Sequence, residues 1–469
     1  MIRIRFLTRA AAPLGLSALF FAAPAGAATP SAPGADTITP PAVSDPMLAP
    51  PPPAPRTVAS WDEALALIRM QSPDYRSSAE AVRRVMAQKE VALAAILPTL
   101  QAQGGYTHEF LAPLQATLAG LVNGATVPFA VVTPPQDAIV LSGTAAWNLV
   151  NPPAMYRVGT ADRAIEAEEL AFEDRRRQIA TSVVDAMLAT LAAARVADLN
   201  RVGLRAALER LALTQARLEY GQGTELDVDR AQQDVAASRS AVITGDESLT
   251  RAREALGQAL GSGVPMAPPE GADLTSFETA VARTCRLNDD IEKRPDVLAA
   301  KKRLEIAERG VHDAELMFAP SLGVFSAVQY ANEPVIAPKT TWSISALVSV
   351  PIYDGGARFG VLHDSGAALE QARDELAAQR LAAIVASARA GRAVGVLEHT
   401  RDVARQQRDL ALRVDARTRD GYSRGLGTSL DLVVSAQALR QAEIDLAILE
   451  FQVDDARANA VLVDAECAY

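Results

Sequence analysis

Aromatic residues, histidines and cysteines are scarce in this sequence. Phe, Trp and Tyr make up 5% of its 469 residues, while Ala, Leu, Arg, Glu and Gln dominate, a balance typical of long packed helices. The histidines, which show no metal-ligand spacing, are His108, His312, His363 and His399. Ser-His-Asp signatures, phosphate loops and dinucleotide fingerprints are also absent. We therefore expect no enzyme activity, no metal site and no bound cofactor.

Concentrated positive charge and long apolar runs are lacking as well. The net charge is -10 and there is no basic tract, so nucleic acid is not an expected partner. The short run Arg175 to Arg177 is expected on a solvated helix face. No run of about 18 apolar residues follows residue 30, so no transmembrane helix is expected. If the protein is exported, as its N-terminal sequence indicates below, it is either soluble or crosses a membrane as a β-barrel.

The N-terminus has the parts of a secretory signal. Basic residues precede an apolar run, and Ala25-Gly26-Ala27 predicts cleavage after Ala27, so residues 1–27 are a signal peptide. Residues 28–56 are rich in Pro, Ala and Ser, which predicts a disordered leader. The mature protein is therefore expected to be exported, with folded sequence beginning near Val58.

A turn motif occurs twice, as GQGTELDV at residues 221–228 and as GLGTSLDL at residues 425–432, at a constant offset of 204. Gly tolerates the left-handed backbone that ends a helix, and Thr or Asp caps the next one. Each copy therefore predicts a turn between two long antiparallel helices. The matched positions are Gly221 and Gly425, Gly223 and Gly427, Thr224 and Thr428, Leu226 and Leu430, and Asp227 and Asp431.

A second repeated feature precedes each turn. Pro73 and Pro98 bound one helical segment, and Pro295 and Pro320 bound another at a constant offset of 222. Beyond each segment the apolar period changes to two, which predicts one β-hairpin per copy. The hairpins are expected at about residues 99–149 and 321–353, and the first contains a long segment, 111–136, that we expect to be a loop.

Very long helices follow the hairpins. They are expected at about residues 154–218 and 357–420, with returning helices at about 226–260 and 430–467. At 1.5 Å per residue, roughly 65 residues form a rod of roughly 100 Å, too long for a compact core. A seven-residue apolar repeat in the first returning helix indicates coiled-coil packing. The domain organisation is therefore a first repeat at 57–262, a mid-height belt at 263–293 and a second repeat at 294–469.

The fold class is mainly α with a β-barrel part. Four strands per chain cannot close a barrel, and an open sheet in lipid leaves unpaired backbone groups at its edges. Three copies would give twelve strands and twelve helical columns around a water-filled lumen. The residues expected to face lipid or its interface are Ile139, Leu141, Trp147, Leu149, Trp342, Ile344, Val348 and Val350.

The order of these features resembles the TolC family of outer-membrane efflux proteins. The resemblance covers about residues 61–467, and it includes the helix openings LVNPP and IYDGG and the two turn motifs. It implies a homotrimer in which a 12-stranded outer-membrane β-barrel continues into a 12-helix periplasmic α-barrel. The implied function is a passive exit duct of a tripartite efflux or type I secretion system. The implied location is the bacterial outer membrane, with a large periplasmic part.

The resemblance also implies partners and roles for the turns. The duct would dock at its tip to a periplasmic adaptor (membrane fusion protein) that serves an inner-membrane pump, and cargo is left open between drugs, metal ions and proteins. The implied adaptor-contact residues are Gly221, Gly223, Thr224, Leu226, Gly425, Gly427, Thr428 and Leu430. Asp227 and Asp431 cap helices, narrow the entrance, or do both. Val434 stands where such members often carry a second acidic residue.

Cys285 and Cys467 are the only cysteines. Export permits pairing, and the last helix, climbing about 55 Å from the tip, would bring Cys467 to the belt that contains Cys285. A disulfide and two free thiols both stay open. The alternative function is an exported periplasmic coiled-coil adaptor or structural protein. Two helical hairpins with inserted strands favour the duct.

Overall fold

The computed structural model describes residues 43–111, 116–122, 125–132, 137–269, 283, 285–287, 290–332 and 338–467. Residues 42–469 form one unit. The expected signal peptide and the first part of the expected leader, up to residue 42, lie outside the described residues. Much of the expected belt, residues 270–282, also lies outside them.

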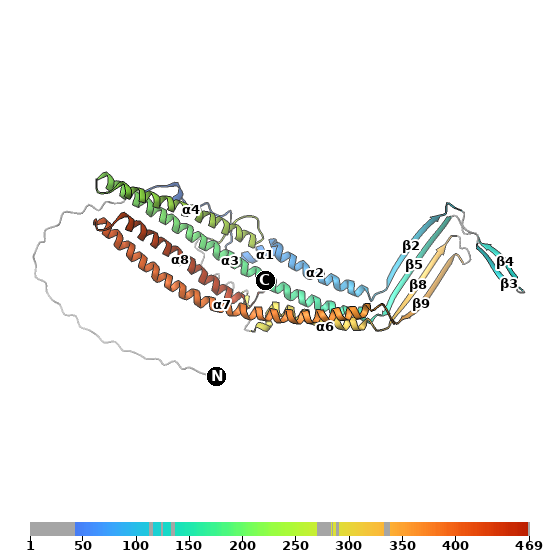
Figure 1. The fold of residues 1–469 in the computed structure, drawn as a ribbon. Coiled ribbons are helices and arrows are strands. Elements are labelled where there is room, and N and C mark those ends of the chain that lie inside the picture. Colours follow the sequence, from blue (N-terminus) through green and yellow to red (C-terminus); the bar gives the residue numbers. More distant parts are fainter. Residues whose placement is uncertain are drawn as a thin grey trace, which may run out of the picture. The chain divides into compact units, whose positions relative to one another are not determined.

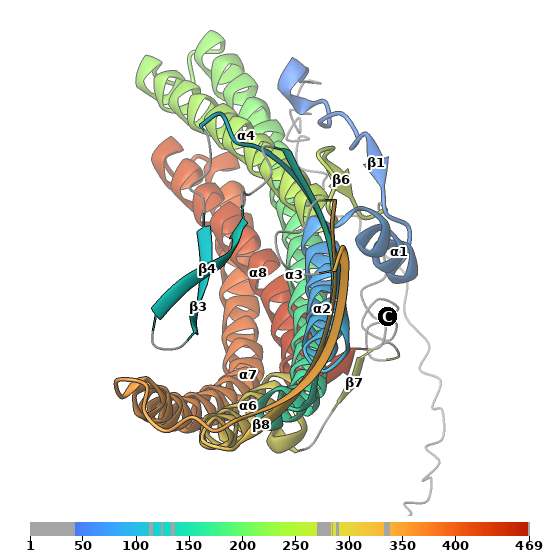
Figure 2. The ribbon, with the colours of Figure 1, turned by 90° about the vertical axis from the view of Figure 1, so that its right-hand side faces the viewer.

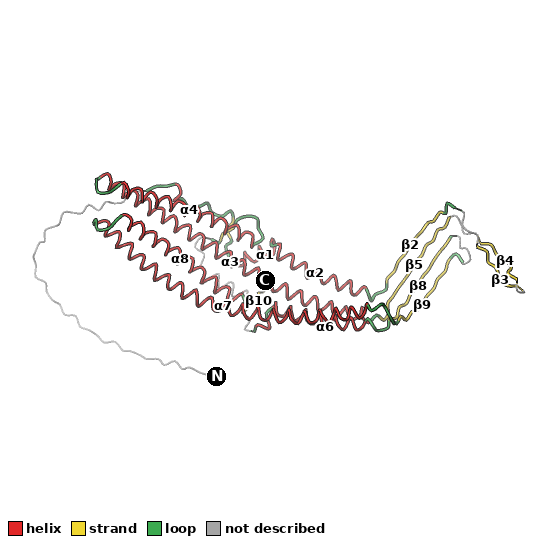
Figure 3. Tube along the Cα trace, in the orientation of Figure 1, coloured by secondary structure: helices red, strands yellow, loops and turns green. Residues whose placement is uncertain are grey.

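Long helices make up most of the described chain (Figures 1 and 3). The helices are α1 (Trp61–Gln71), α2 (Pro73–Ala94), α3 (Pro152–Glu219), α4 (Glu225–Ala259), α6 (Pro295–Leu316), α7 (Ala357–Ser423) and α8 (Ser429–Leu462), with short 3₁₀ helices η1 (Pro46–Leu48) and η2 (Ile291–Lys293). The strands are β1 (Arg56–Thr57), β2 (Thr99–His108), β3 (Ala116–Val122), β4 (Ala125–Val132), β5 (Asp137–Val150), β6 (Met266–Ala267), β7 (Cys285–Leu287), β8 (Ser321–Ala331), β9 (Thr340–Ser349) and β10 (Ala465–Cys467).

The main sheet and the helices beside it share one order. The sheet runs β2-β5-β8-β9 with every pair antiparallel. Below it, α2 packs on α3, α3 on α6, and α6 on α7, so each strand continues into the helix that shares its place (Figure 1). Farther from the sheet, α4 packs on α3, and α8 lies between α3 and α7. The chain therefore forms a wall whose columns are a strand followed by helix.

Local signals fix where the helices begin. Ser72 accepts a hydrogen bond from the backbone of Tyr75 at the start of α2, where Pro73 takes the first helical position. Asn151 caps α3 in the same way. Gly356 precedes α7 with a φ of 92°, a left-handed conformation that favours glycine.

Two expected element boundaries are wrong. The segment expected to be a loop contains strands β3 and β4, which pair antiparallel with each other. The last helix ends at Leu462 rather than at residue 467, because residues 465–467 form β10 and pair with β7. In each case a strand partner satisfies the backbone in place of a loop or a further helical turn.

The expectation of a disordered leader up to residue 56 is also wrong for its last part. From residue 43 onward the chain lies along α3 and α4, where η1 packs against a small apolar cluster of those helices. Arg239 donates to the Asp45 carboxylate at 3.1 and 2.8 Å, and Arg253 donates to the Pro52 carbonyl at 2.8 Å. Partners distant in sequence therefore order this segment, which we call the N-terminal strap (residues 43–57).

The largest core cluster lies at mid-height, where α1 packs on α3 near the ends of α4 and α8. The β1 strand pairs in parallel with β6 on the same flank (Figure 2). The fully buried members of the core cluster include Trp61, Ile68 and Val183. The expectation that no stretch has the length and apolar character of a transmembrane helix is wrong for α3, which contains one long and apolar enough to cross a membrane. The core cluster explains why this stretch is apolar. The apolar residues of α3 gather where it forms this core, at residues 179–188.

Candidate channel wall and periplasmic tip

The pairing register gives the main sheet two chemically different faces. Directly paired residues of antiparallel strands lie on one face, and residues two apart on a strand share a face. The first face is mostly apolar; on β5 and β9 it has Ile139, Leu141, Ala145, Trp147, Trp342, Ile344, Ala346 and Val348. The second is mostly polar and carries no charged residue over the described strands, although Val140, Phe325 and Leu347 also lie on it; its polar residues include Gln101, Gln103, Ser142, Thr144, Gln329, Ser343 and Ser345. Such a sheet can separate an apolar phase from a water-filled space.

Most of the lipid-facing candidates lie on the apolar face, but Leu149 does not. A β-bulge between Asn148 and Val150 leaves Leu149 without a partner on β8. Val150 pairs with Leu322, two residues from the partner of Trp147, so Val150 takes the place expected for Leu149. Val350 is the one candidate outside a described strand; it follows the end of β9 and is 58% exposed.

Several polar groups on the apolar face have partners within the sheet. At one end, Asp137 of β5 accepts hydrogen bonds from the Tyr106 hydroxyl and from His108, each at 2.7 Å. On β9, the Trp342 indole donates to the Ser326 hydroxyl at 3.0 Å. Sequence reasoning missed the Tyr106, His108 and Asp137 group, since only the register brings it together. Paired polar side chains lower the cost of placing this face in lipid.

The two turns at the far end of the helices have the same construction. Gly221 and Gly425 adopt left-handed backbones, with φ of 69° and 76°. Each turn then enters its helix through a reciprocal capping box. In the first, the Asp227 amide donates to the Thr224 hydroxyl and the Thr224 amide donates to the Asp227 carboxylate, both at 3.2 Å. In the second turn, Thr428 and Asp431 make the same pair of bonds at 3.2 and 3.1 Å.

Asp227 and Asp431 differ in what else they touch. Asp227 accepts a further hydrogen bond from the Ser429 hydroxyl, which joins the two turns of one chain. The Ser429 hydroxyl, and after it Thr224, holds the pKa of Asp227 below its ordinary value despite partial burial. At Asp431 the pKa is lowered by Thr428 of its own turn. The structure therefore gives both carboxylates the capping role, and only Asp227 a link between turns.

The remaining tip residues present an open surface. Leu226 is 56% exposed and Leu430 is 47% exposed, while the glycines beside them keep the turns small. Leu426, between the glycines of the second turn, is 84% exposed. Exposed leucines at a narrow tip are suited to contact with another protein.

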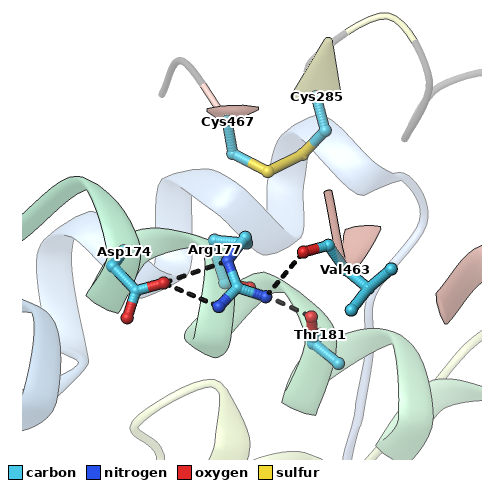
Figure 4. The surroundings of a disulfide bond; sticks show 6 residues. All are labelled: Asp174, Arg177, Thr181, Cys285, Val463 and Cys467. Atoms are coloured by element: carbon cyan, nitrogen blue, oxygen red, sulfur yellow. Dashed lines mark hydrogen bonds and ion pairs between the residues drawn. A yellow bond between two sulfur atoms is a disulfide. The ribbon is translucent and has the colours of Figure 1, made fainter. Parts of the chain in front are cut away.

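A disulfide closes the mid-height region (Figure 4). It joins Cys285 of β7 to Cys467 of β10, the two residues for which a disulfide and free thiols were both open. Beside it, Arg177 of α3 binds Asp174 at 2.6 Å and donates to the Val463 carbonyl at 3.4 Å (Figure 4). Arg177 is therefore a structural residue, and the expected solvated face is wrong for it. The bond ties the end of the chain to the belt.

Buried charges join the same region to α7. Arg294 contacts Asp296 at 2.8 Å and Asp464 at 3.0 Å, with both side chains of the first pair almost fully buried. Burial alone favours neutral Asp296, but the Arg294 guanidinium keeps its pKa below the ordinary value. Ser387 of α7 donates to the other oxygen of Asp464 at 2.6 Å. Over the described residues, no group of three or more His, Cys, Asp or Glu side chains is placed to hold a metal ion.

Comparison with known proteins agrees with this architecture. Residues 146–262 and 287–462 match the family of outer membrane efflux proteins. The pyoverdine export outer membrane protein OpmQ of Pseudomonas putida is 23% identical over 419 residues, which cover 86% of this chain and 85% of that protein. A shorter match, 26% identical, covers 31% of this chain and 28% of the fusaric acid resistance protein FusA of Burkholderia cepacia.

Among solved structures, the CmeC outer membrane channel of Campylobacter jejuni has the same fold. It superposes with a TM-score of 0.71 at 13% identity, covering 86% of this chain and 84% of that one. The family match spans most of both helical repeats and the strands β8 and β9. The chain belongs to the outer membrane efflux protein family and is an outer-membrane exit duct with a periplasmic part.

Proposed function

We propose that three copies of this chain close into one duct, which passively conducts cargo from an inner-membrane pump and its adaptor out of the cell. The observation that carries this proposal is the main sheet, with one mostly apolar face, one mostly polar and uncharged face, and two edge strands, β2 and β9. A sheet edge in lipid is costly unless another strand pairs with it. Pairing β9 of one copy with β2 of the next removes every edge of the main sheet.

Three copies contribute twelve strands of the main sheet, and their helices form a twelve-column periplasmic barrel beneath it. The apolar face, with Trp147 and Trp342, then contacts lipid, and the face with Gln101 and Thr144 lines the lumen. Helix α7 supports this arrangement, because it lies at one edge of the wall and leaves apolar residues such as Val396, 63% exposed, without cover in a single chain.

The partner at the tip is a periplasmic adaptor. Its contact surface consists of the two turns, with Leu226 and Leu430 as apolar contacts and Gly221, Gly223, Gly425 and Gly427 keeping the tip slender. Thr224 and Thr428 hold the shape of this surface through their capping boxes. The adaptor connects the duct to an inner-membrane pump of an efflux or type I secretion system.

Membrane fractionation and native mass spectrometry test the duct. We expect the protein in outer membranes as a trimer that survives mild detergent, and we expect ion conductance after reconstitution in planar bilayers. Recovery as a soluble monomer would rule out the proposal.

Asp431 has a second proposed role at the entrance, where three copies of it would surround the passage. We expect Asp431→Ala to raise single-channel conductance in planar bilayers if the carboxylate narrows the entrance. The control is Asp409→Asn, which changes an exposed carboxylate of α7 away from the turn. Unchanged conductance in Asp431→Ala would leave capping as the only role of this residue.

A further inference from the structure

One aromatic side chain lies on the mostly polar face of the main sheet. The Phe, Trp and Tyr residues of its four strands are Tyr106, Trp147, Phe325, Tyr330 and Trp342. Phe325 of β8 pairs with Ala146 of β5 and Ser345 of β9, which lie on the mostly polar face, whereas the pairing of the other four places them on the apolar face. Phe325 is 40% exposed in the single chain. It therefore does not belong to the aromatic residues expected to face lipid.

A glycine beside Phe325 makes room for its ring. Gly323 lies two residues earlier on β8 and therefore shares the face of Phe325. A Cβ on Gly323 would lie 2.9 Å from Cε2 and 3.1 Å from Cζ of the Phe325 ring, and Gly323 itself is buried. The ring therefore covers the Gly323 backbone and lies along the wall of the sheet.

Leu347 extends this apolar surface onto β9. It pairs with Gly323 and lies diagonally across from Phe325, a spacing at which long side chains are within reach of each other. Leu347 is 58% exposed. The other large apolar residue of this face, Val140, pairs with Ala331 at the far end of β8 and lies apart from it. We call Gly323, Phe325 and Leu347 the inner-face patch.

The surroundings of the inner-face patch are uncharged. Its direct neighbours across the strands are Asn148, Ala146 and Ser345, and this face carries no charged residue over the described strands. A lining without charge does not select solutes by the sign of their charge, whereas apolar side chains in contact with water attract the apolar groups of any solute. The patch lies near the ends of β8 and β9 that connect to α6 and α7 (Figure 1).

We propose that the inner-face patch, with Phe325 at its centre, binds the apolar part of a solute that passes through the duct, whatever the sign of the solute's charge. Strand β8 lies inside the sheet rather than at an edge, so pairing between copies leaves Phe325 uncovered. Lipid covers the opposite face, so a solute in the lumen is the group that reaches the ring. This inference rests on the proposed closed duct, and it adds a contact residue and the chemistry that this residue recognises.

Thiol labelling of the full-length protein in proteoliposomes first tests which face the patch lines. Ser345 and Ile344 are neighbours on β9 that the register places on opposite faces. We expect a charged, membrane-impermeant methanethiosulfonate to label Ser345→Cys and to leave Ile344→Cys unlabelled. The unmodified protein, whose two cysteines form the disulfide, gives the background. Labelling of Ile344→Cys that equals or exceeds that of Ser345→Cys would overturn the inference.

Uncharged alkyl methanethiosulfonates then test the apolar contact. Ser345 lies directly opposite Phe325, whereas Thr341 pairs with Gln329, four residues farther along the same face. We expect the rate of the butyl reagent, relative to the methyl reagent, to be higher at Ser345→Cys than at Thr341→Cys. Adding Phe325→Ser should lower this rate ratio about fivefold at Ser345→Cys and leave it unchanged at Thr341→Cys. A fivefold change corresponds to about 40 Å² of apolar surface removed from water.

The matched control is Val324→Ser, which introduces the same residue at the neighbouring position on the apolar face. It should leave the rate ratio at Ser345→Cys unchanged. A ratio that Phe325→Ser does not lower, or that Val324→Ser lowers equally, would overturn the inference. Native mass spectrometry and conductance of the unmodified protein separate the two levels of the proposal. Absence of a conducting trimer defeats the duct itself, whereas a conducting trimer whose rate ratio does not depend on Phe325 defeats only the binding assigned to the patch.

Discussion

The two long helices α3 and α7 hold equivalent places in the two repeats, yet the single chain buries them to different degrees. Sixteen of the 68 residues of α3 are buried, against six of the 67 residues of α7. Helix α3 has α2, α6, α4 and α8 as its main neighbours, whereas the main helical neighbours of α7 in the described part of the chain are α6 and α8. The first lies inside the wall and the second at its edge.

This difference shows how one repeated sequence serves two purposes. Helix α3 carries the apolar cluster of the belt and so organises the fold of the single chain. Helix α7 leaves Leu381, Val396 and Val403 more than half exposed, which is expensive unless a neighbouring copy or the assembled duct covers them. If the proposed trimer forms, we therefore expect α3 to matter most for the folding of one chain and α7 for the assembly of several.

The largest expected effect comes from a charge placed in the buried part of α3. Val183 is fully buried in the belt core, so Val183→Asp places an unpaired carboxylate there and costs about 4 kcal/mol of folding free energy. Val396→Asp on α7 is the matched control; it should allow the chain to fold but weaken the trimer. Circular dichroism of purified protein and the trimer yield in outer membranes measure the two effects. Normal thermal unfolding of the Val183→Asp protein would contradict the role assigned to α3.

The disulfide gives the next largest effect, because it fastens the end of the second repeat beside α3. It links residues 182 positions apart, and its removal by Cys285→Ser with Cys467→Ser should cost roughly 3 kcal/mol of stability. Thermal unfolding of this variant and of the unmodified protein measures the loss. Mass spectrometry of unreduced protein provides the direct check, and two free thiols would reject the bond.

Features set by local chemistry could be predicted from the sequence, and features set by distant partners could not. Asn151-Pro152 and the Thr-Asp pairs of the two turns carry their own capping groups, so the beginnings of α3, α4 and α8 follow from neighbouring residues. The N-terminal strap has the composition of a disordered leader, and partners far away in the sequence order it, among them Arg201, Arg239 and Arg253.

The strands show the same limit in another form. Alternation predicted the apolar face of β5 and β9, but the bulge at Leu149 depends on pairing with β8 and left no sign in the alternation. Strands β3 and β4 did have a signal that was overlooked, since Asn123-Gly124 between apolar runs is a common hairpin sequence. The helix lengths showed that Cys285 and Cys467 could lie close together, but they did not show that the two residues meet, so the disulfide could not be predicted from them.

A smaller, pH-dependent effect sharpens the contrast between α3 and α7. Burial, and then the neighbouring Asp185 carboxylate of α3, raises the pKa of Asp455 on α8 to about 6. Because this exceeds the ordinary value of 3.8, the folded protein binds the proton more tightly than the unfolded chain, and stability falls as pH rises through about 6. The pKa values of Asp227 and Asp296 are lowered, so the stability that these carboxylates contribute to the folded protein is lost only at more acidic pH. At the position of α7 equivalent to Asp185 stands Arg389, so that helix lacks this acid.

We therefore expect a higher thermal midpoint at pH 5.5 than at pH 7.5. The difference corresponds to about 1 kcal/mol, since Asp455 remains partly exposed to solvent. Asp455→Asn should abolish it, whereas Asp409→Asn, which changes an exposed carboxylate of α7, should retain it. A midpoint in Asp455→Asn that still rises at lower pH would remove this pair from the explanation.

The smallest effect concerns the two turns, where the capping boxes are alike and the surroundings differ. Thr224→Ala and Thr428→Ala each remove one box and should cost about 1 kcal/mol. Asp227→Ala should loosen more than its own turn, because it also removes the acceptor of the Ser429 bond that joins the turns. Hydrogen exchange should therefore rise at residues 220–230 and 424–434 in Asp227→Ala, but only at residues 424–434 in Asp431→Ala. Equal changes, each confined to the mutated turn, would mean that the Ser429–Asp227 bond does not couple the two turns and that each turn is stabilised by its own capping box alone.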